Sequence, residues 1–447
     1  MSFSSLGLSE WIVRQCAALR FRRPTEIQLH CIPPILQGKS CMGCAKTGSG
    51  KTAAFALPIL QHLAADPYGI YALVLTPTRE LAYQIADQFR AIGKPIGLRV
   101  AVVIGGMDMM RQSIELSSQP HVVVATPGRL ADHLQSSDTF HLQKIKFLVL
   151  DEADRLLEAS FADDLSVIFD AVPTRRQTLL FSATLTDALK DLKDLAGEKP
   201  VFYEAKSEIA TVDELHQKYV LMPAKVKDCY MIHLLRHFCK KDDCSVIVFT
   251  STCRNCQILA QLLSSSDFSC APLHSLLSQR SRLASLAKFK SNQVKILVAT
   301  DVASRGLDIP TVQVVLNANV PADPKDYIHR VGRTARAGRG GLAVTLVTQY
   351  DVKRIQAIEK RIGTTLTDYS VAEKDVLTLL NEVTIARREI ELKLSKSSFG
   401  EKREINRQKR KFLEESLAAK KHKMVLTPRE RRRKTKSKIP KSTQKNT

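Results

Sequence analysis

Short runs of valine, isoleucine and leucine recur along the chain, each followed by a polar or glycine-rich turn and then by a helical stretch. Apolar runs that do not alternate with polar residues are typical of strands buried on both faces of a parallel sheet. We predict strands at 71–76, 100–104, 121–125, 147–150 and 178–181, and again at 246–250, 295–299, 312–316 and 342–348. Two such series predict an α/β protein with two tandem, doubly wound parallel-sheet domains.

The same pattern divides the chain into five segments. We expect an N-terminal region at 1–30, a first α/β domain at 31–204, a linker at 205–217, a second α/β domain at 218–365 and a C-terminal extension at 366–447. The linker is predicted from a polar stretch without clear periodicity. Residues 368–394 have a helical pattern, whereas the last twenty residues hold almost no large apolar side chains and are expected to be disordered.

Charge changes this picture, because the chain carries a formal net charge of +22 and about two-thirds of it lies after Arg387. Such an uneven distribution predicts a polyanionic partner, and nucleic acid is favoured over a membrane because no amphipathic apolar face accompanies the charge. No apolar run approaches the length of about eighteen residues that spans a bilayer, and the first residues do not resemble a signal peptide. We therefore expect an intracellular protein with no membrane partner.

The ten cysteines are scattered, as in proteins of a reducing compartment. Two Cys-x-x-Cys pairs, Cys41/Cys44 and Cys253/Cys256, could bind zinc together. However, we place the first pair on a strand that leads into a phosphate-binding loop, and the second at the start of a helix in the other domain. A structural zinc site requires ligands that converge tetrahedrally, so we favour ordinary packing roles for these cysteines.

The strongest motif is a glycine-rich loop between an apolar segment and a helix that we expect to begin near Thr52. It comprises Ala45, Lys46, Thr47, Gly48, Ser49, Gly50, Lys51 and Thr52. Glycines let backbone N–H groups curl around phosphates, and the helix N-terminus adds positive potential. Lys51 is predicted to contact the terminal phosphates and Thr52 to ligate Mg²⁺. The general pattern begins with glycine rather than Ala45, and the alternative is an ordinary glycine-rich turn.

An acidic cluster, Asp151-Glu152-Ala153-Asp154, directly follows the strand predicted at 147–150. Ligands of parallel sheets bind outside the carboxyl ends of the strands, where this cluster should lie. Asp151 is therefore predicted to hold Mg²⁺, and Glu152 to orient or deprotonate the attacking water. The alternative is a helix N-terminus enriched in acidic residues, which is common.

With these motifs the chain resembles the DEAD-box RNA helicases over nearly all of residues 1–365. Phe21-x-x-Pro24-Thr25-x-x-Gln28 resembles the family's Q motif, and Phe3 stands at its upstream aromatic position. The resemblance implies two RecA-like domains and ATP as the nucleotide, with Phe21 stacked on adenine and Gln28 bonded to its edge. The chain departs from the family pattern at Arg20 and Ala335, where glycine is usual.

Further residues take their expected roles from this resemblance alone. The RNA contacts that it implies are Pro77, Thr78, Arg79, Gly105, Gly106, Thr126, Pro127, Gly128 and Arg129 in the first half, and Thr250, Arg282, Thr300, Arg305 and Gly306 in the second. Ser182 and Thr184 would couple hydrolysis to strand separation. Asp308 would face the nucleotide, and the arginine fingers Arg333 and Arg336 would join Lys51, Asp151 and Glu152 as catalytic residues.

These residues predict a split active site that closes when ATP and RNA bridge both domains. The expected function is RNA-dependent ATP hydrolysis with local unwinding or remodelling of RNA and RNA–protein complexes. A DNA translocase and an ATP-gated RNA clamp with little unwinding are the alternatives. The residues that surround the motifs are most similar to those of nucleolar DEAD-box family members that act in small-subunit ribosomal RNA maturation. That likeness predicts a nuclear, nucleolar protein that binds pre-ribosomal RNA, and a stimulating partner protein in a pre-ribosomal particle. The basic extension would tether RNA.

Overall fold

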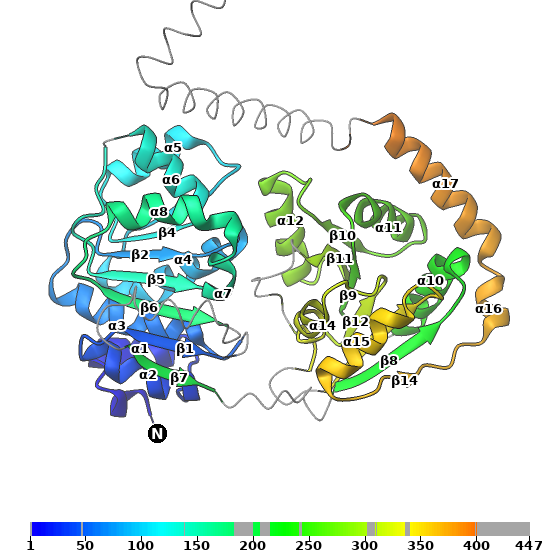
Figure 1. Ribbon diagram of the computed structural model, residues 1–447, viewed down its shortest axis with the longest axis horizontal. Helices are drawn as coiled ribbons and strands as arrows, with labels where there is room; N and C mark the ends of the chain where they lie inside the picture. Colours follow the sequence, from blue (N-terminus) through cyan, green and yellow to red (C-terminus); the bar gives the residue numbers. More distant parts are fainter. Residues whose placement is uncertain are drawn as a thin grey trace, which may run out of the picture. The chain divides into compact units, whose positions relative to one another are not determined.

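The computed structural model describes residues 2–45, 48–137, 139–182, 200–205, 215–240, 244–301, 309, 311–335, 340–397 and 399. It separates into two compact units, Met1–Val383 and Thr384–Thr447. The first unit contains two parallel seven-stranded sheets, one after the other along the chain (Figure 1). This confirms the prediction of two tandem α/β domains with parallel sheets.

The first sheet has the strand order β3-β4-β2-β5-β6-β1-β7, with every pair parallel. Its strands are β1 (Cys41–Cys44), β2 (Ala72–Leu75), β3 (Val100–Val103), β4 (Val122–Ala125), β5 (Phe147–Asp151), β6 (Gln177–Ser182) and β7 (Val201–Glu204). Its helices are α1 (Glu10–Ala18), α2 (Glu26–Leu36), α3 (Lys51–Ala65), α4 (Arg79–Gly93), α5 (Met109–Ser117), α6 (Pro127–Ser136), α7 (Ala153–Leu156) and α8 (Ala162–Ala171).

Helices cover both faces of this sheet because alternate residues of each apolar strand face opposite ways. In β2, Ala72 and Val74 pack into the core that contains residues of α1 to α4. Their neighbours Leu73 and Leu75 pack into the core that contains residues of α5 to α8. All four side chains are fully buried, which explains why the strand sequences are apolar throughout rather than alternating.

The second sheet repeats this plan with the order β10-β11-β9-β12-β13-β8-β14. Its strands are β8 (Leu215–Leu221), β9 (Val246–Thr250), β10 (Cys270–Leu273), β11 (Ile296–Thr300), β12 (Val314–Asn317), β13 (Gly341–Val347) and β14 (Thr367–Asp368). Its helices are α10 (Lys227–Phe238), α11 (Cys253–Ser265), α12 (Gln279–Lys290), α14 (Pro324–Val331), α15 (Val352–Ile362) and α16 (Glu373–Leu377). One core gathers residues of α12, α14 and α15 on one face, and α11 packs against β9, β10 and β11.

Every predicted strand exists, with ends moved by at most two residues. The sequence interpretation missed four strands: β7, β10 and β14, which lie at edges of their sheets, and β8, which lies between β13 and β14. Edge strands are covered on fewer sides, so their sequences need not be apolar throughout. In β7, partly buried and exposed positions alternate. The strand β10 carries Pro272, which is tolerated at an edge because one side of the strand has no neighbouring strand in the sheet.

Three elements cross predicted boundaries. The strand β8 begins at Leu215, inside the linker expected at 205–217, and pairs with β13. The strand β14 pairs with β8 although it lies beyond residue 365, the expected end of the second domain. The helix α2 runs from Glu26 to Leu36 and so crosses residue 30, the expected end of the N-terminal region. In the first two cases the pairing of strands, rather than the local composition, identifies the element.

After β14, most of the described C-terminal extension is helical, in agreement with the helical pattern of residues 368–394. It comprises α16 and then α17 (Leu380–Lys396), whose C-terminal part begins the second unit. Two ion pairs at helical spacing join Arg387 to Glu391 at 2.9 Å and Lys393 to Glu389 at 2.7 Å. Most of the basic tail lies outside the described residues.

Candidate nucleotide and RNA sites

The phosphate loop leaves β1 at the carboxyl edge of the first sheet. Cys44 is in register with Ser182 of β6, and the Ala45 N–H donates to the Ser182 carbonyl at 3.1 Å. The loop then turns into α3, which begins at Lys51, one residue before the predicted start. Lys51 Nζ donates to the Ala45 carbonyl at 2.6 Å, so the lysine folds back over the loop. Lys46 and Thr47 lie outside the described residues.

The acid pair lies at the end of β5, where Asp151 is in register with Phe181 of β6. Glu152 has a φ of +54°, in the left-handed region that costs a non-glycine residue about 1 kcal/mol or more. Its N–H donates to Asp151 Oδ1 at 3.1 Å, and Arg155 Nη1 lies 3.5 Å from its Oε2. Backbone strain of this kind concentrates at functional sites, where surrounding contacts maintain it.

Burial controls the charges of this cluster. Burial and, to a lesser extent, the neighbouring Asp151 raise the pKa of Glu152 to about 7. Burial also raises the pKa of Asp151, against the opposing effect of Lys51. Burial lowers the pKa of Lys51, while Asp151, Glu152 and Asp154 act in the opposite direction. Lys51 and Arg155 therefore face three carboxylates, so the cluster holds more acidic than basic groups.

A divalent cation and a polyphosphate fit this chemistry. Mg²⁺ usually binds through one or two carboxylates together with substrate phosphates and water. The predicted protein ligands, Thr52 and Asp151, would provide part of such a coordination shell, and the phosphates would provide the rest. The described residues contain no group of three or more acidic, histidine or cysteine side chains that could hold a metal ion without phosphate. The Ser49 hydroxyl is buried with no hydrogen-bond partner among the described residues, at the point where phosphate oxygens would accept.

The Q-motif residues lie beside the phosphate loop. Gln28 is 5% exposed; its Oε1 accepts from the Thr25 N–H at 3.0 Å, and its Nε2 donates to the Gly50 carbonyl at 3.1 Å. Gly50 has a φ of +88°, and a Cβ there would collide with Gln28 Nε2, so only glycine fits. Phe21 is half-buried against the core, and Phe3 is buried within it. The structure thus brings Gln28, one of the two predicted adenine contacts, against the phosphate loop.

The predicted RNA contacts of the first domain lie just beyond the carboxyl ends of β2, β3 and β4. These residues are Pro77, Thr78, Arg79, Gly105, Gly106, Thr126, Pro127, Gly128 and Arg129. The Arg79 guanidinium lies against the glycine pair, so that a Cβ on Gly106 would collide with its Nη1. Arg129 Nη1 donates to the Met107 carbonyl at 3.0 Å. Two arginines and two glycines therefore line one edge of the sheet.

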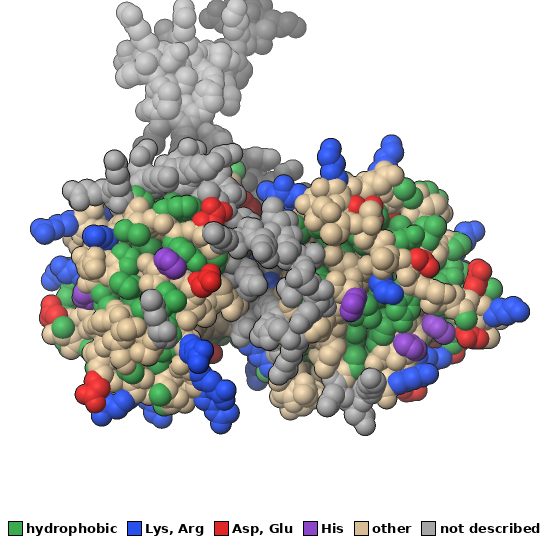
Figure 2. All heavy atoms as spheres, turned by 90° about the horizontal axis from the view of Figure 1, so that it is seen from below, with side chains coloured by type: hydrophobic (Ala, Val, Ile, Leu, Met, Phe, Trp, Pro, Cys, Tyr) green, Lys and Arg blue, Asp and Glu red, His purple; other side chains and the backbone are tan. Residues whose placement is uncertain are grey.

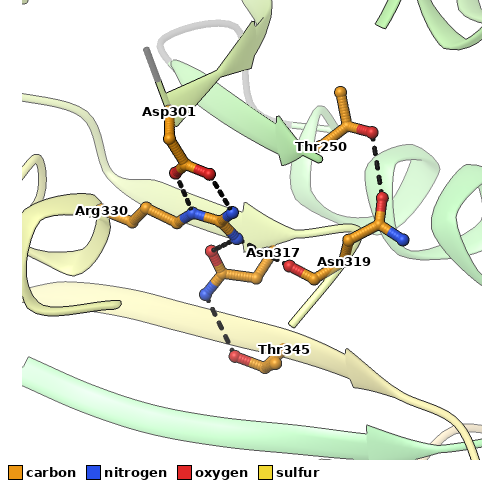
Figure 3. Close-up of polar contacts among 6 residues, drawn as sticks. All are labelled: Thr250, Asp301, Asn317, Asn319, Arg330 and Thr345. Carbon is orange, nitrogen blue, oxygen red and sulfur yellow. Dashed lines mark hydrogen bonds and ion pairs between the residues drawn. The ribbon is translucent and has the colours of Figure 1, made fainter. Parts of the chain in front are cut away.

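The corresponding residues of the second domain are more deeply buried. Thr250 ends β9 and is fully buried; its hydroxyl donates to Asn319 Oδ1 at 2.9 Å (Figure 3) and accepts from Asn255 at 2.7 Å. In this conformation it offers no surface to RNA. Thr300 ends β11 and is 5% exposed, with its hydroxyl unpartnered among the described residues. Both threonines therefore lie at the carboxyl edge of the second sheet, and their direct contact with RNA stays a prediction.

Arg282 has a partner that the sequence interpretation missed. Its Nη2 lies 2.9 Å from Glu80 Oε2, and Gln279 Nε2 donates to Glu80 Oε1 at 2.8 Å. Glu80 is 2% exposed. A carboxylate at that depth requires a charged or hydrogen-bonded partner. The sequence signal for such a partner is the presence of an acidic residue, Glu80, within the motif Pro77–Ala82.

Arg333 and Ser182 are both almost fully buried, at 3% and 1% exposure. Ser182 ends β6 beside the phosphate loop, and Arg333 follows α14 in the second domain. The remaining predicted site residues, Thr184, Arg305, Gly306, Asp308 and Arg336, lie outside the described residues.

The two cysteine pairs occupy the predicted positions, one on β1 of the first sheet and the other at the start of α11 in the second domain. Burial raises the pKa of Cys44 to about 11 and that of Cys256 to about 12. Cys256 donates to the Val298 carbonyl at 3.1 Å, a packing role.

A phosphate loop and an acid pair on one sheet, with polar motifs at the carboxyl edges of both sheets, define a nucleotide-dependent helicase core. The DEAD/DEAH box helicase family matches residues 25–192, and the helicase conserved C-terminal domain family matches residues 227–338. The chain belongs to the DEAD-box family of ATP-dependent RNA helicases.

Curated relatives match nearly the whole chain. The probable ATP-dependent RNA helicase DDX49 of Mus musculus is 60% identical over 416 residues, which cover 92% of this chain and 87% of the relative. The ATP-dependent RNA helicase dbp8 of Schizosaccharomyces pombe is 50% identical over 422 residues, 92% of each chain. RNA-dependent enzymatic activity therefore follows from family membership as well as from the motifs.

A solved structure shows the same pair of RecA-like domains. S. cerevisiae Dbp5 bound to RNA and ADP BeF3 is similar with a TM-score of 0.75 and 30% identity, over 86% of this chain and 99% of that chain. Among the described residues, no helix has both the length and the apolar character needed to cross a bilayer.

Proposed function

We propose that this helicase hydrolyses ATP through the buried cluster of Lys51, Asp151 and Glu152, and uses the cycle to open short RNA duplexes locally. The observation that carries this assignment is the position of Glu152, held in a strained backbone conformation beside Asp151 with a pKa raised to about 7. A carboxylate poised near neutral pH is suited to accept a proton from water. When bound, Mg²⁺ would neutralise phosphate charge, with Thr52 and Asp151 as its protein ligands.

The remaining catalytic groups belong to the second domain. Arg333, together with Arg336, is assigned to stabilise the charge that develops on the transferred phosphate. Because Lys51 and the acid pair lie on the first sheet, fast hydrolysis requires the two domains to close on ATP. RNA that contacts both carboxyl edges favours the same closed state, so RNA stimulates hydrolysis without a separate signal.

The edge residues suit recognition of the RNA backbone rather than its bases. Gly105, Gly106 and Gly128 allow close backbone approach, and Arg79 and Arg129 supply positive charge. Contacts of this kind reach sugar and phosphate and are independent of sequence. Opening about five base pairs costs on the order of 7 kcal/mol, which limits one ATP cycle to short duplexes.

The biological substrate that we favour is pre-ribosomal RNA in the nucleolus, with a partner protein of the pre-ribosomal particle as activator. This assignment is supported by the likeness of the motif surroundings to nucleolar family members of small-subunit maturation. The basic extension supports RNA binding as a tether. On the face drawn in Figure 2, Lys and Arg side chains stand at several separate places rather than in one continuous patch. The concentrated positive charge of the chain lies in the sequence after Arg387.

ATPase rates of the full chain without nucleic acid, with single-stranded RNA and with matched DNA test the proposal. RNA should stimulate turnover and DNA should not, and Glu152→Gln should lower the stimulated rate by about 10²–10⁴-fold. Glu158→Gln, which changes an exposed carboxylate nearby, should have no effect. Equal stimulation by DNA would favour a translocase. Tight ATP-dependent RNA binding without turnover in the unaltered protein would favour the clamp.

A further inference from the structure

Tyr203, to which the sequence gives no role, joins the edge strand β7 to α2, the helix that carries Gln28. Its ring stacks on the His30 ring of α2, with the ring centroids 4.1 Å apart and the planes inclined by 11°. Its hydroxyl donates to Glu26 Oε2, also of α2, at 3.3 Å. Glu26 and His30 are one helical turn apart and therefore share one face of α2, whereas Gln28, two residues from each, points the other way. Tyr203 thus holds the face of α2 opposite Gln28.

The helix α2 forms one side of the nucleotide site. Gln28 Oε1 accepts from the Thr25 N–H at 3.0 Å, and its Nε2 donates to the carbonyl of Gly50 in the phosphate loop at 3.1 Å. A side-chain amide has two N–H donors and an oxygen with two lone pairs, so one donor and one lone pair remain for the edge of adenine. Adenine bound there would therefore fix α2 more firmly against the phosphate loop.

The residues that follow Tyr203 are attached to the phosphate side of the same site. Glu204 is in register with Cys44 of β1, and the Ala205 N–H donates to the Cys44 carbonyl at 2.9 Å. Cys44 directly precedes Ala45, the first residue of the phosphate loop. Residues 203–205 therefore contact both the helix on the adenine side and the strand that leads to the phosphates.

The strand β7 is also the last strand of the first sheet along the chain. After Ala205 the chain continues to the second domain, whose first strand, β8, begins at Leu215. Because β7 lies at the edge of its sheet, β1 is its one neighbouring strand, and Tyr203 and Ala205 pack against the core to which α2 contributes. The contacts with α2 therefore help to fix the point from which the chain leaves the first domain.

We propose that Tyr203 is a positioning residue that couples ATP binding to RNA binding, by holding α2 on the strand from which the chain leaves the first domain; this inference rests on the proposed function. ATP that binds α2 and the phosphate loop then also fixes β7, which favours the closed arrangement in which RNA contacts both domains. A ligand shifts such an equilibrium only as far as it binds one arrangement better than the other. Loosening the contact between Tyr203 and α2 therefore weakens the mutual enhancement of ATP and RNA binding, and leaves the direct contacts of each ligand intact.

The test is the affinity of the full chain for a labelled single-stranded RNA, measured by fluorescence anisotropy with and without a non-hydrolysable ATP analogue and Mg²⁺. The ratio of the two dissociation constants is the coupling factor, and values of about 5–150 are typical of linked sites. Tyr203→Leu removes the stacked ring and the hydroxyl, and should lower the coupling factor by about 3–10-fold, in keeping with the strength of an aromatic pair. The dissociation constants for RNA without the analogue, and for the analogue without RNA, should stay unchanged.

Further variants separate the parts of this contact. Tyr203→Phe keeps the stacked ring and should retain most of the coupling factor. His30→Ala removes the stack from the side of α2 and should lower the factor as Tyr203→Leu does, whereas His30→Phe keeps a ring there and should preserve it. Tyr350→Leu, the same replacement at a tyrosine of the second domain that is 79% exposed, is the matched control and should leave the factor unchanged.

A purely structural role gives a different pattern. Tyr203→Leu would then lower the melting temperature and leave the coupling factor unchanged below that temperature, which would overturn the inference. An equal loss of affinity for the analogue with and without RNA would also overturn it, since Tyr203 would then only shape the adenine site. Should Tyr203→Leu not fold, His30→Ala, a change on the exposed face of α2, gives the same comparison, and an unchanged coupling factor there would overturn the inference.

The unaltered protein separates this result from a failure of the proposed function. Equal RNA affinity with and without the analogue in the unaltered protein would contradict the proposed closure on ATP and RNA. A coupling factor that is present in the unaltered protein and persists in Tyr203→Leu and His30→Ala would reject only the role of Tyr203.

Discussion

Two residues that depart from the family pattern carry backbone conformations that glycine adopts more easily. Arg20 and Ala335 stand where the family usually has glycine, and their φ angles are +62° and +52°. Arg20 closes α1: its N–H donates to the Ala17 carbonyl at 3.0 Å, and the Phe21 N–H donates to the Cys16 carbonyl at 2.9 Å. This is the pattern of a Schellman motif, in which glycine is preferred at the left-handed position. The strained residue therefore directs the chain toward Phe21, the proposed adenine contact.

Arg20→Gly should stabilise the protein by about 1 kcal/mol, because it relieves the left-handed strain at an exposed position. The free energy of unfolding of the first domain, measured in urea, checks this prediction. The KM for ATP should not change. Ala18→Gly, in the last turn of the same helix, is the matched control. It should destabilise by about 0.5–1 kcal/mol, since its backbone is helical. Equal effects of the two substitutions would contradict the strain argument.

At the scale of elements, one side chain, Gln28, bonds to both the N-terminus of α2 and the phosphate loop. Gln28 and Thr25 form a capping box, in which Gln28 Oε1 accepts from the Thr25 N–H. The same amide donates to the carbonyl of Gly50, the residue before α3. A helix cap thus also fixes the turn of the phosphate loop. The Q-motif pattern therefore has a structural role besides its proposed contact with adenine.

Gln28→Glu should raise the KM for ATP by about tenfold or more, because a carboxylate would face the Gly50 carbonyl without a donor. Loss of that hydrogen bond should lower the free energy of unfolding by about 1–3 kcal/mol. ATP titration and urea unfolding measure the two effects. Gln143→Glu, at an exposed loop position, is the control and should change neither. An unchanged KM for ATP would mean that the loop holds its conformation without Gln28.

At the scale of the whole molecule, the proposed catalytic groups come from two sheets. Lys51, Asp151 and Glu152 belong to the first sheet and Arg333 to the second domain. Each sheet has its own hydrophobic core, so each can hold its share of the site rigidly without the other. In the proposed mechanism, catalysis depends on an equilibrium between domain arrangements, which ATP and RNA shift together.

Arg333→Ala should retain ATP binding and lose about 10³–10⁵-fold of RNA-stimulated turnover, the usual value of an arginine finger. Binding of a fluorescent ATP analogue and single-turnover hydrolysis separate the two effects. Arg361→Ala, an exposed change in the same domain, should leave both intact. Unchanged turnover in Arg333→Ala would rule out the split site.

Much of the fold was predictable because its signals are local in the chain. A buried central strand such as β9 or β4 is an uninterrupted apolar run, and the phosphate loop from Ala45 to Thr52 has all its residues together. The edge strand β3 was predicted from its apolar run, but β7, β10 and β14 were not, because each is short and lacks an uninterrupted run of valine, isoleucine and leucine. The basic charge after Arg387 likewise follows from the sequence alone.

The sequence by itself therefore determined the class of fold, the enzyme family and the residues that belong to the ATP and RNA motifs. Only the tertiary structure decided which side chains act as partners. It buried Thr250, paired Glu80 with Arg282, and placed Arg330 between Asp301 and Asn319. These partners are far apart in sequence, and a buried charge or hydroxyl is satisfied by whichever group the fold brings within hydrogen-bonding distance.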